Sequence, residues 1–136
     1  MLIIEGRSRT RALAVAYWTA TGLVCAELVV GGIWDIVRLP LVRETVAALG
    51  YPAYFLVILG VWKVLGGAAL LAPRFARLKE WAYAGVVFAD TGAIASHLWT
   101  GTGLGEIPVL AVLLLLTVVS WATRPPGRVL SPPGPG

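Results

Sequence analysis

Four long apolar runs constrain the fold of this chain more than any other feature of its sequence. They cover residues 12–33, 53–72, 80–99 and 107–123. Each run has roughly 17 to 22 residues, which at a rise of 1.5 Å per residue crosses a hydrocarbon core about 30 Å thick. No segment has the alternating pattern of a strand, and a membrane span must satisfy its backbone hydrogen bonds internally. We therefore expect an all-α fold, a four-helix transmembrane bundle.

Composition agrees with a single membrane domain. The chain has 136 residues, 58% of them apolar and only 13% charged, with a mean hydropathy of +0.83. The net charge of +4 does not indicate a nucleic-acid partner, because the basic residues lie at the ends of the apolar runs and form no stripe with interleaved aromatics. The expected partner is the lipid bilayer. The single cysteine, Cys25, excludes an internal disulfide and any CxxC redox pair.

Domain boundaries follow from the same pattern. Residues 1–124 form the transmembrane domain, and residues 125–136 are so rich in Pro and Gly that we expect a disordered cytoplasmic tail. The first apolar run follows three arginines, as in a signal peptide. It is longer than a typical signal sequence core and contains no convincing cleavage site, so we interpret it as a retained first helix.

The connection between the first two runs has a helical pattern of its own. From Pro40 to Leu49, one side carries Arg43 and Glu44, and the other side is mostly apolar. The residues on that second side are Leu41, Val42, Thr45, Val46 and Leu49. This pattern predicts a short interfacial helix lying on the outer membrane surface.

Basic residues predict the orientation in the cell membrane. Eight of them lie at the N-terminus, in the second connection and at the C-terminus, whereas the first connection has only Arg38 and Arg43 and the third has none. By the positive-inside rule both termini are cytoplasmic. Aromatic residues fit interfacial belts, with Trp34, Tyr51, Tyr54 and Trp99 at the outer face and Trp81, Tyr83 and Trp121 at the inner face.

Four ionisable residues, Glu27, Lys63, Asp90 and His97, lie inside the apolar runs. Such groups usually face the protein interior and mark functional positions. Counted from the expected helix ends, Lys63 and Asp90 lie at the bilayer midplane, which predicts an ion pair. Glu27 and His97 lie about 5 to 10 Å from the outer face and would form a second polar layer. Asp90 and His97 share a helix face, so a polar track would lead inward from the outer interface.

Two interpretations of this polar set remain open. The charges can lock the helices together, or they can line a pocket for a lipophilic molecule with a polar head. No ligand spacing for a metal ion is present, so no metal is expected. Small residues at four-residue spacing, such as Gly85 with Ala89 and Gly92 with Ser96, predict surfaces where helices pack closely.

Residues 49–98 resemble the core of the DoxX-like family of small four-helix bacterial membrane proteins. The resemblance is carried by the LGYP turn, by the WKVLG element that contains Lys63, by the RLKEWAYAG stretch and by His97. It implies a four-helix bundle distantly similar to a subunit of an archaeal terminal quinol oxidase complex and to membrane proteins linked to thiol redox balance. It also implies that Lys63, Asp90 and His97 form the polar interior, and it assigns none of them a catalytic label.

Three functions follow as hypotheses. The first is a redox-associated accessory subunit that binds a quinone or another lipophilic carrier, with other membrane or redox subunits as partners. The chain has no intrinsic cofactor motif, and a haem with two histidine ligands is excluded by the single histidine. The second is a membrane enzyme that performs acid-base chemistry on a hydrophobic substrate. The third is a non-catalytic scaffold.

Overall fold

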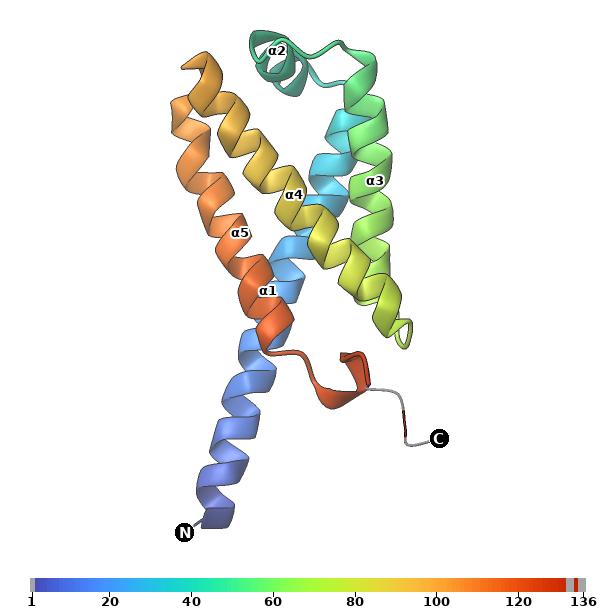
Figure 1. Cartoon of the computed structure of the whole chain (residues 1–136), viewed down its shortest axis with the longest axis vertical. Helices are drawn as coiled ribbons and strands as arrows, with labels where there is room; N and C mark the ends of the chain where they lie inside the picture. The colour runs from blue at the N-terminus through green and yellow to red at the C-terminus, as the bar shows by residue number, and fades with distance from the viewer. Residues whose placement is uncertain (1, 132–133, 135–136) are drawn as a thin grey trace.

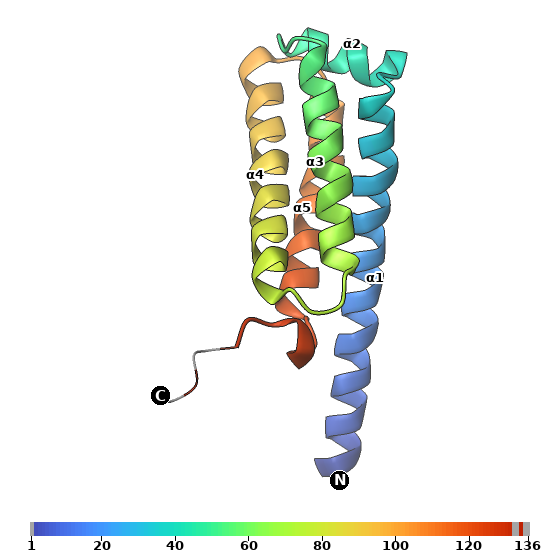
Figure 2. The same ribbon diagram turned by 90° about the vertical axis from the view of Figure 1, so that its right-hand side faces the viewer.

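The computed structural model describes residues 2–131 and 134, and this part of the chain is all-helical, as predicted (Figure 1). Four long helices run alternately up and down beside one another, while a short helix lies across one end of the bundle (Figure 2). The long helices are α1 (Leu2–Ile36), α3 (Tyr54–Leu71), α4 (Ala76–Thr100) and α5 (Ile107–Ala122). The short helix is α2 (Pro40–Ala48), and two 3-10 turns follow, η1 (Leu104–Glu106) and η2 (Pro126–Arg128).

Three helical segments are long and apolar enough to cross a membrane by length and composition. They are Leu2–Ile36, Tyr54–Leu71 and Leu104–Ala122. The remaining long helix, α4, has 25 residues and is therefore about 37 Å long. It is less apolar than the others because its second half includes Asp90, Thr91 and His97. The fold therefore contains three clear candidate spans and a fourth, more polar helix packed among them.

The contact between α1 and α3 is the closest in the bundle, and two glycines make it possible. A Cβ atom added to Gly60 would lie 2.5 Å from the carbonyl oxygen of Gly32, and one added to Gly32 would lie 2.9 Å from the carbonyl oxygen of Gly60. Only residues without a side chain allow two backbones to approach so closely. This contact fixes α3 against α1.

The core lies towards the end of the bundle opposite α2. Its apolar residues are Val24, Cys25, Leu28, Leu70, Tyr83 and Val86. Cys25 packs there as a small apolar side chain, as expected. Tyr83 is only 3% exposed, so its prediction as an inner-belt residue was wrong. Its hydroxyl lies 2.7 Å from Oγ of Ser120, which lies 2.6 Å from Oγ1 of Thr21, and these hydrogen bonds stabilise the buried position.

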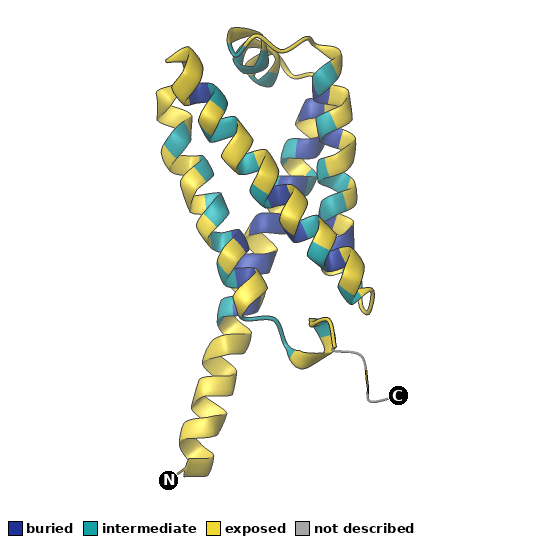
Figure 3. Ribbon diagram, in the orientation of Figure 1, coloured by how far each residue is buried: buried dark blue, intermediate teal, exposed yellow. Residues whose placement is uncertain are grey.

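Helix α1 begins ten residues before the expected apolar run. Residues 2–15 are exposed, and this segment projects beyond the bundle as a continuous helix (Figure 3). Hydropathy locates only the apolar part of a helix, whereas residues such as Arg7, Arg9 and Arg11 are good helix formers that extend it. At its other end α1 continues to Ile36, which places Asp35 inside the helix.

Two cationic side chains donate hydrogen bonds to carbonyl groups at the C-terminal end of α3. Lys79 is fully buried, and its Nζ donates to the carbonyl oxygens of Ala69 (3.0 Å) and Ala72. Arg128 donates from Nη1 to the carbonyl oxygen of Leu70 at 3.1 Å. The last carbonyls of a helix have no intrahelical partner and carry partial negative charge, so both contacts stabilise the end of α3.

Arg128 lies within residues 125–136, for which disorder stays a prediction. Pro126–Arg128 form a 3-10 turn, and the guanidinium also lies over the rings of Tyr17 and Trp18. An arginine with carbonyl and aromatic partners can hold such a turn against the bundle. Residues 132–133 and 135–136 of the expected tail lie outside the described residues.

Candidate functional site

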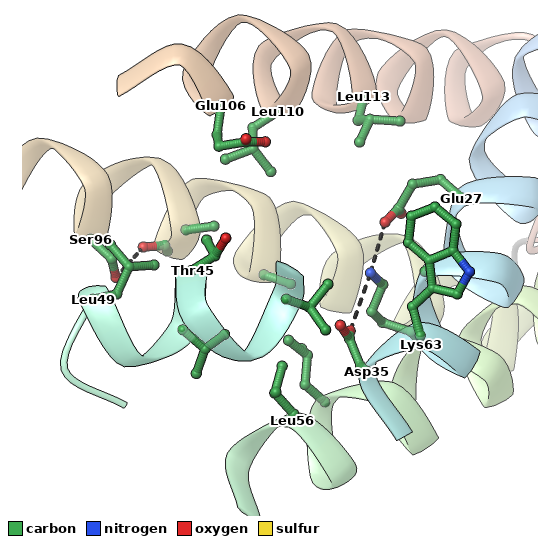
Figure 4. A pocket seen from close by; sticks show the side chains of 18 of the residues that line it. Glu27, Asp35, Thr45, Leu49, Leu56, Lys63, Ser96, Glu106, Leu110 and Leu113 are labelled. Atoms are coloured by element: carbon green, nitrogen blue, oxygen red, sulfur yellow. Dashed lines mark hydrogen bonds and ion pairs between the residues drawn. The ribbon is translucent and has the colours of Figure 1, made fainter. Parts of the chain in front are cut away.

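A cavity of about 850 Å³ lies beneath α2, with walls from all four long helices and η1 (Figure 4). Most of its lining is apolar, including Leu56, Leu110 and Leu113. Its polar and ionisable lining residues are Glu27, Asp35, Thr45, Tyr51, Lys63, Ser96, His97 and Glu106. The volume lies within the range of about 300–1,000 Å³ typical of small-molecule sites.

Helix α2 covers one end of this cavity. The helix itself was predicted correctly, and the five residues of its expected apolar side, Leu41, Val42, Thr45, Val46 and Leu49, all line the cavity. The apolar side of α2 faces the interior of the bundle, and the expected position on the outer membrane surface stays a prediction. An amphipathic helix buries its apolar side against the nearest apolar surface, and here the upper walls of the cavity provide that surface.

The charged centre of the cavity consists of Lys63 between two carboxylates of α1. The Lys63 Nζ lies 2.7 Å from Oε1 of Glu27 and 3.4 Å from Oδ2 of Asp35. Glu27 and Asp35 are eight residues apart and therefore share one face of α1. The side chain of Asp35 is 7% exposed, that of Lys63 19% and that of Glu27 32%. We call these three residues the ion triad; Glu27 is its most accessible member.

Gly31 makes room for the ion triad. It lies between the two carboxylates on the same face of α1, and a Cβ atom there would be 2.8 Å from Nζ of Lys63 and 2.9 Å from Oε1 of Glu27. Both distances are shorter than real Cβ contacts, so any side chain at Gly31 displaces the ammonium group. The ammonium therefore lies directly against the backbone of α1.

The predicted pair of Lys63 with Asp90 was wrong. Among the described residues the salt bridges of Lys63 go to Glu27 and Asp35, and Oδ2 of Asp90 is buried without a hydrogen-bond partner. The prediction assumed that helices joined by a short connection share their polar side chains. Instead, the Gly32–Gly60 contact turns Lys63 towards α1, and Asp90 is not among the residues that line the cavity.

His97 lies at another part of the cavity wall and is 3% exposed. Its Nδ1 lies 2.8 Å from the backbone oxygen of Thr102 in the loop that follows α4. Because a carbonyl only accepts, this contact places a proton on Nδ1 and, in the neutral ring, leaves Nε2 as an acceptor. Glu27 and His97 line the same cavity, and Glu27 pairs with Lys63, while the predicted common depth of Glu27 and His97 in the bilayer stays a prediction.

Sequence reasoning missed Asp35 and Glu106, which both line the cavity. Asp35 lay beyond the expected end of the first helix, but its spacing of eight residues from Glu27 was a usable signal, because two such residues share a face if the helix continues. Glu106 directly precedes the fourth apolar run, so nothing local distinguishes it from an ordinary interfacial carboxylate.

The small residues of α4 do not form the packing surface that their spacing predicted. A Cβ atom at Gly85 or Gly92 would meet no atom within 4 Å outside its own local helix. Gly92, Ala89 and Ala93 instead line the cavity. Small side chains permit close approach only when a second backbone occupies the space, and at these positions they leave the space open.

The described residues contain no group of three His, Cys, Asp or Glu side chains placed to hold a metal ion. What the cavity offers is an apolar wall with a few fixed polar groups, namely an ammonium donor, carboxylate acceptors and an imidazole. Such an arrangement binds and orients an amphipathic small molecule.

The apolar helices and the polar interior define the class of a multi-pass α-helical membrane protein. A model of the DoxX-like family matches residues 19–120, so the chain belongs to this family, and the resemblance noted from its central residues is confirmed. No curated protein and no solved structure matches the chain.

Proposed function

We propose that this protein binds a lipophilic small molecule with an uncharged polar head, such as a quinone, in the cavity beneath α2, and that it serves as a redox-associated accessory subunit in the cell membrane. The observation that carries the proposal is the cavity itself, because it combines a volume of about 850 Å³ and a largely apolar wall with the ion triad. In this proposal α4 spans the membrane together with α1, α3 and α5.

The charges of the site favour a neutral head group. Lys63 faces two carboxylates in the ion triad, and Glu106 adds a third acidic side chain to the wall. The formal charge of the cavity is therefore negative, which disfavours a carboxylate or phosphate head. A carbonyl of a neutral head can accept from Nζ of Lys63, and a hydroxyl, which a quinol has and a quinone lacks, can donate to Glu27.

The accessibility of the Lys63–Glu27 pair fits the binding of a quinone head. Glu27 keeps about a third of its side chain exposed while bound to Lys63, so both ends of the ion pair can be reached. Asp35, more deeply buried, holds the ammonium in place from the other side. A bound quinone would supply the electron-accepting chemistry, whereas the residues of this chain bind its head, orient it and exclude water from it.

Two variants with the same chemical change test the proposal. Glu27→Gln removes a charge inside the cavity, and Glu44→Gln removes one from the exposed side of α2. Decylubiquinone binding is measured in detergent by quenching of tryptophan fluorescence, and lipid extracts of gently solubilised protein are analysed by mass spectrometry. We expect E27Q to weaken binding and to lower the amount of copurifying ligand at least tenfold, and E44Q to leave both unchanged.

Equal binding by the parent protein and E27Q would contradict the proposed site. If the parent protein neither binds the probe nor retains any lipophilic ligand, the ion triad serves only to fix α3 against α1. The scaffold function would then replace ligand binding.

A further inference from the structure

A second cavity, of about 380 Å³, lies between α3 and α4. Its walls consist of apolar side chains together with the stem of Lys63, and the two large aromatic residues beside it, Trp62 and Trp81, are 68% and 69% exposed. We call this second cavity the lateral groove. In a bilayer, side chains exposed at this position contact lipid, so the groove is open to the hydrocarbon core.

The groove exists because both helices carry small residues where they face each other. Gly66 and Ala69 contribute from α3, and Ala82 and Gly85 contribute from α4. A Cβ atom at Gly66 or Gly85 would meet no atom within 4 Å outside its own local helix.

The lateral groove adjoins the cavity beneath α2. Three residues, Leu59, Lys63 and Ala89, line both spaces. The charged end of Lys63 lies in the ion triad, while its aliphatic stem borders the groove. The two spaces therefore adjoin at Lys63, and one is polar at the ion triad while the other is almost entirely apolar.

We infer that the lateral groove holds the hydrocarbon tail of the molecule whose polar head lies at the ion triad, so that the ligand is a lipid with one linear chain that reaches the site sideways from the bilayer. The inference rests on the proposed function. A cavity of about 150 Å³ already holds benzene, so 380 Å³ accommodates a longer hydrocarbon segment but not a protein helix. Because the groove adjoins the ion triad at Lys63, a hydrocarbon segment in the groove can belong to the same molecule as a polar head at the triad.

Filling the groove tests the inference. Gly85→Leu and Gly66→Leu each place a branched side chain in open space on opposite walls, and Leu is a better helix former than Gly. Gly22→Leu is the matched control, because Gly22 is exposed on α1, has the same free surroundings and lines neither space. The probes are decylubiquinone and its head group without a chain, 2,3-dimethoxy-5-methyl-1,4-benzoquinone, titrated in detergent with thermal stability and oligomeric state recorded for every variant.

We expect G85L and G66L to weaken binding of decylubiquinone at least tenfold while the tail-free probe binds as it does to the parent protein and to G22L. Unchanged binding of both probes would overturn the groove as a tail site and leave the cavity beneath α2 intact. Equal weakening of both probes would also overturn it, as would a change of oligomeric state with unchanged decylubiquinone binding, which would assign the groove to a second copy of the chain. If the parent protein binds neither probe, the proposed function fails, and this inference fails with it.

Discussion

Lys63 forms ion pairs with two carboxylates of α1. The effects on stability of substitutions at these three residues should therefore depend on one another. A charge removed from a buried pair leaves its partner unpaired in a medium of low dielectric constant, at a cost of about 3–5 kcal/mol. The two ion pairs should contribute unequally to stability, because the Nζ atom of Lys63 is 2.7 Å from Glu27 and 3.4 Å from Asp35. The strongest coupling in the site should therefore join Lys63 to Glu27.

A pair of double-mutant cycles tests this coupling. We expect Lys63→Met and Glu27→Leu to be non-additive by about 1–3 kcal/mol in unfolding free energy, because the Lys63–Glu27 pair is lost only once in the double variant, whereas Asp35 loses its ammonium partner in every Lys63 variant. The coupling of Lys63→Met with Asp90→Leu should be smaller, since no salt bridge joins these two residues. Reversible unfolding in mixed micelles gives both values, and a larger coupling for Asp90 than for Glu27 would contradict the ion triad.

Substitutions of His97 can distinguish the effect of its Nδ1 contact with Thr102 from the effect of its acceptor Nε2. Replacement by alanine leaves the Thr102 carbonyl without its donor and should destabilise the protein by about 1–3 kcal/mol. Replacement by asparagine retains an N–H donor near the position of Nδ1 but removes Nε2, so H97N should recover most of the stability. If Nε2 contacts the ligand, H97N still binds decylubiquinone more weakly than the parent protein. Equal stability of H97A and H97N would show that the Thr102 contact contributes nothing.

At the level of helices, the packing of α1 against α3 requires close approach of the two backbones at Gly32 and Gly60. Gly60→Ala places a Cβ atom 2.5 Å from the Gly32 carbonyl oxygen and 2.9 Å from the amide nitrogen of Ile36, and neither backbone atom can yield cheaply. We expect G60A to lower the unfolding free energy by more than about 2 kcal/mol, comparable to overpacking in other cores. The measurement is unfolding in mixed micelles.

Gly66→Ala is the control for this prediction. Gly66 lies on the same helix, but a Cβ atom there meets nothing within 4 Å. Alanine favours helix over glycine by about 0.5–1 kcal/mol, so G66A should be neutral or slightly stabilising. A loss in G66A as large as that in G60A would show that the contact with α1 does not decide the effect.

The elements also show why the sequence predicts helices better than their contacts. Hydropathy and helix signals are local, and the ranges 53–72 and 107–123 agree closely with α3 and α5. The side of α3 that faces α1 depends on a contact between Gly32 and Gly60, which are 28 positions apart, and no local pattern specifies it. Of the four predicted polar residues, Glu27, Lys63 and His97 line the cavity. The predicted partner of Lys63 was wrong, because it depended on which side of α3 faces α1.

At the scale of the whole molecule, an even number of long helices places both described ends of the chain on the same side. The N-terminal extension of α1, the α3–α4 connection and η2 lie at one end of the bundle, and α2 and η1 lie at the other (Figures 1 and 2). The basic residues divide in the same way, with eight at the first end and only Arg38 and Arg43 at the second. By the positive-inside rule we therefore expect the end that carries α2 to face outward.

Alkaline phosphatase fusions test this orientation, because the enzyme is active only after export from the cytoplasm. A fusion within residues 101–106, between α4 and α5, should be active, and a fusion after Arg124 should be inactive. The reason is the excess of basic residues at the end that carries Arg7, Arg74 and Arg124, which the positive-inside rule retains in the cytoplasm. Activity at the second fusion but not at the first would invert the molecule and place the α2 roof on the cytoplasmic side. Equal activity at both would mean that α5 does not cross the membrane, and the four-span arrangement would then be wrong.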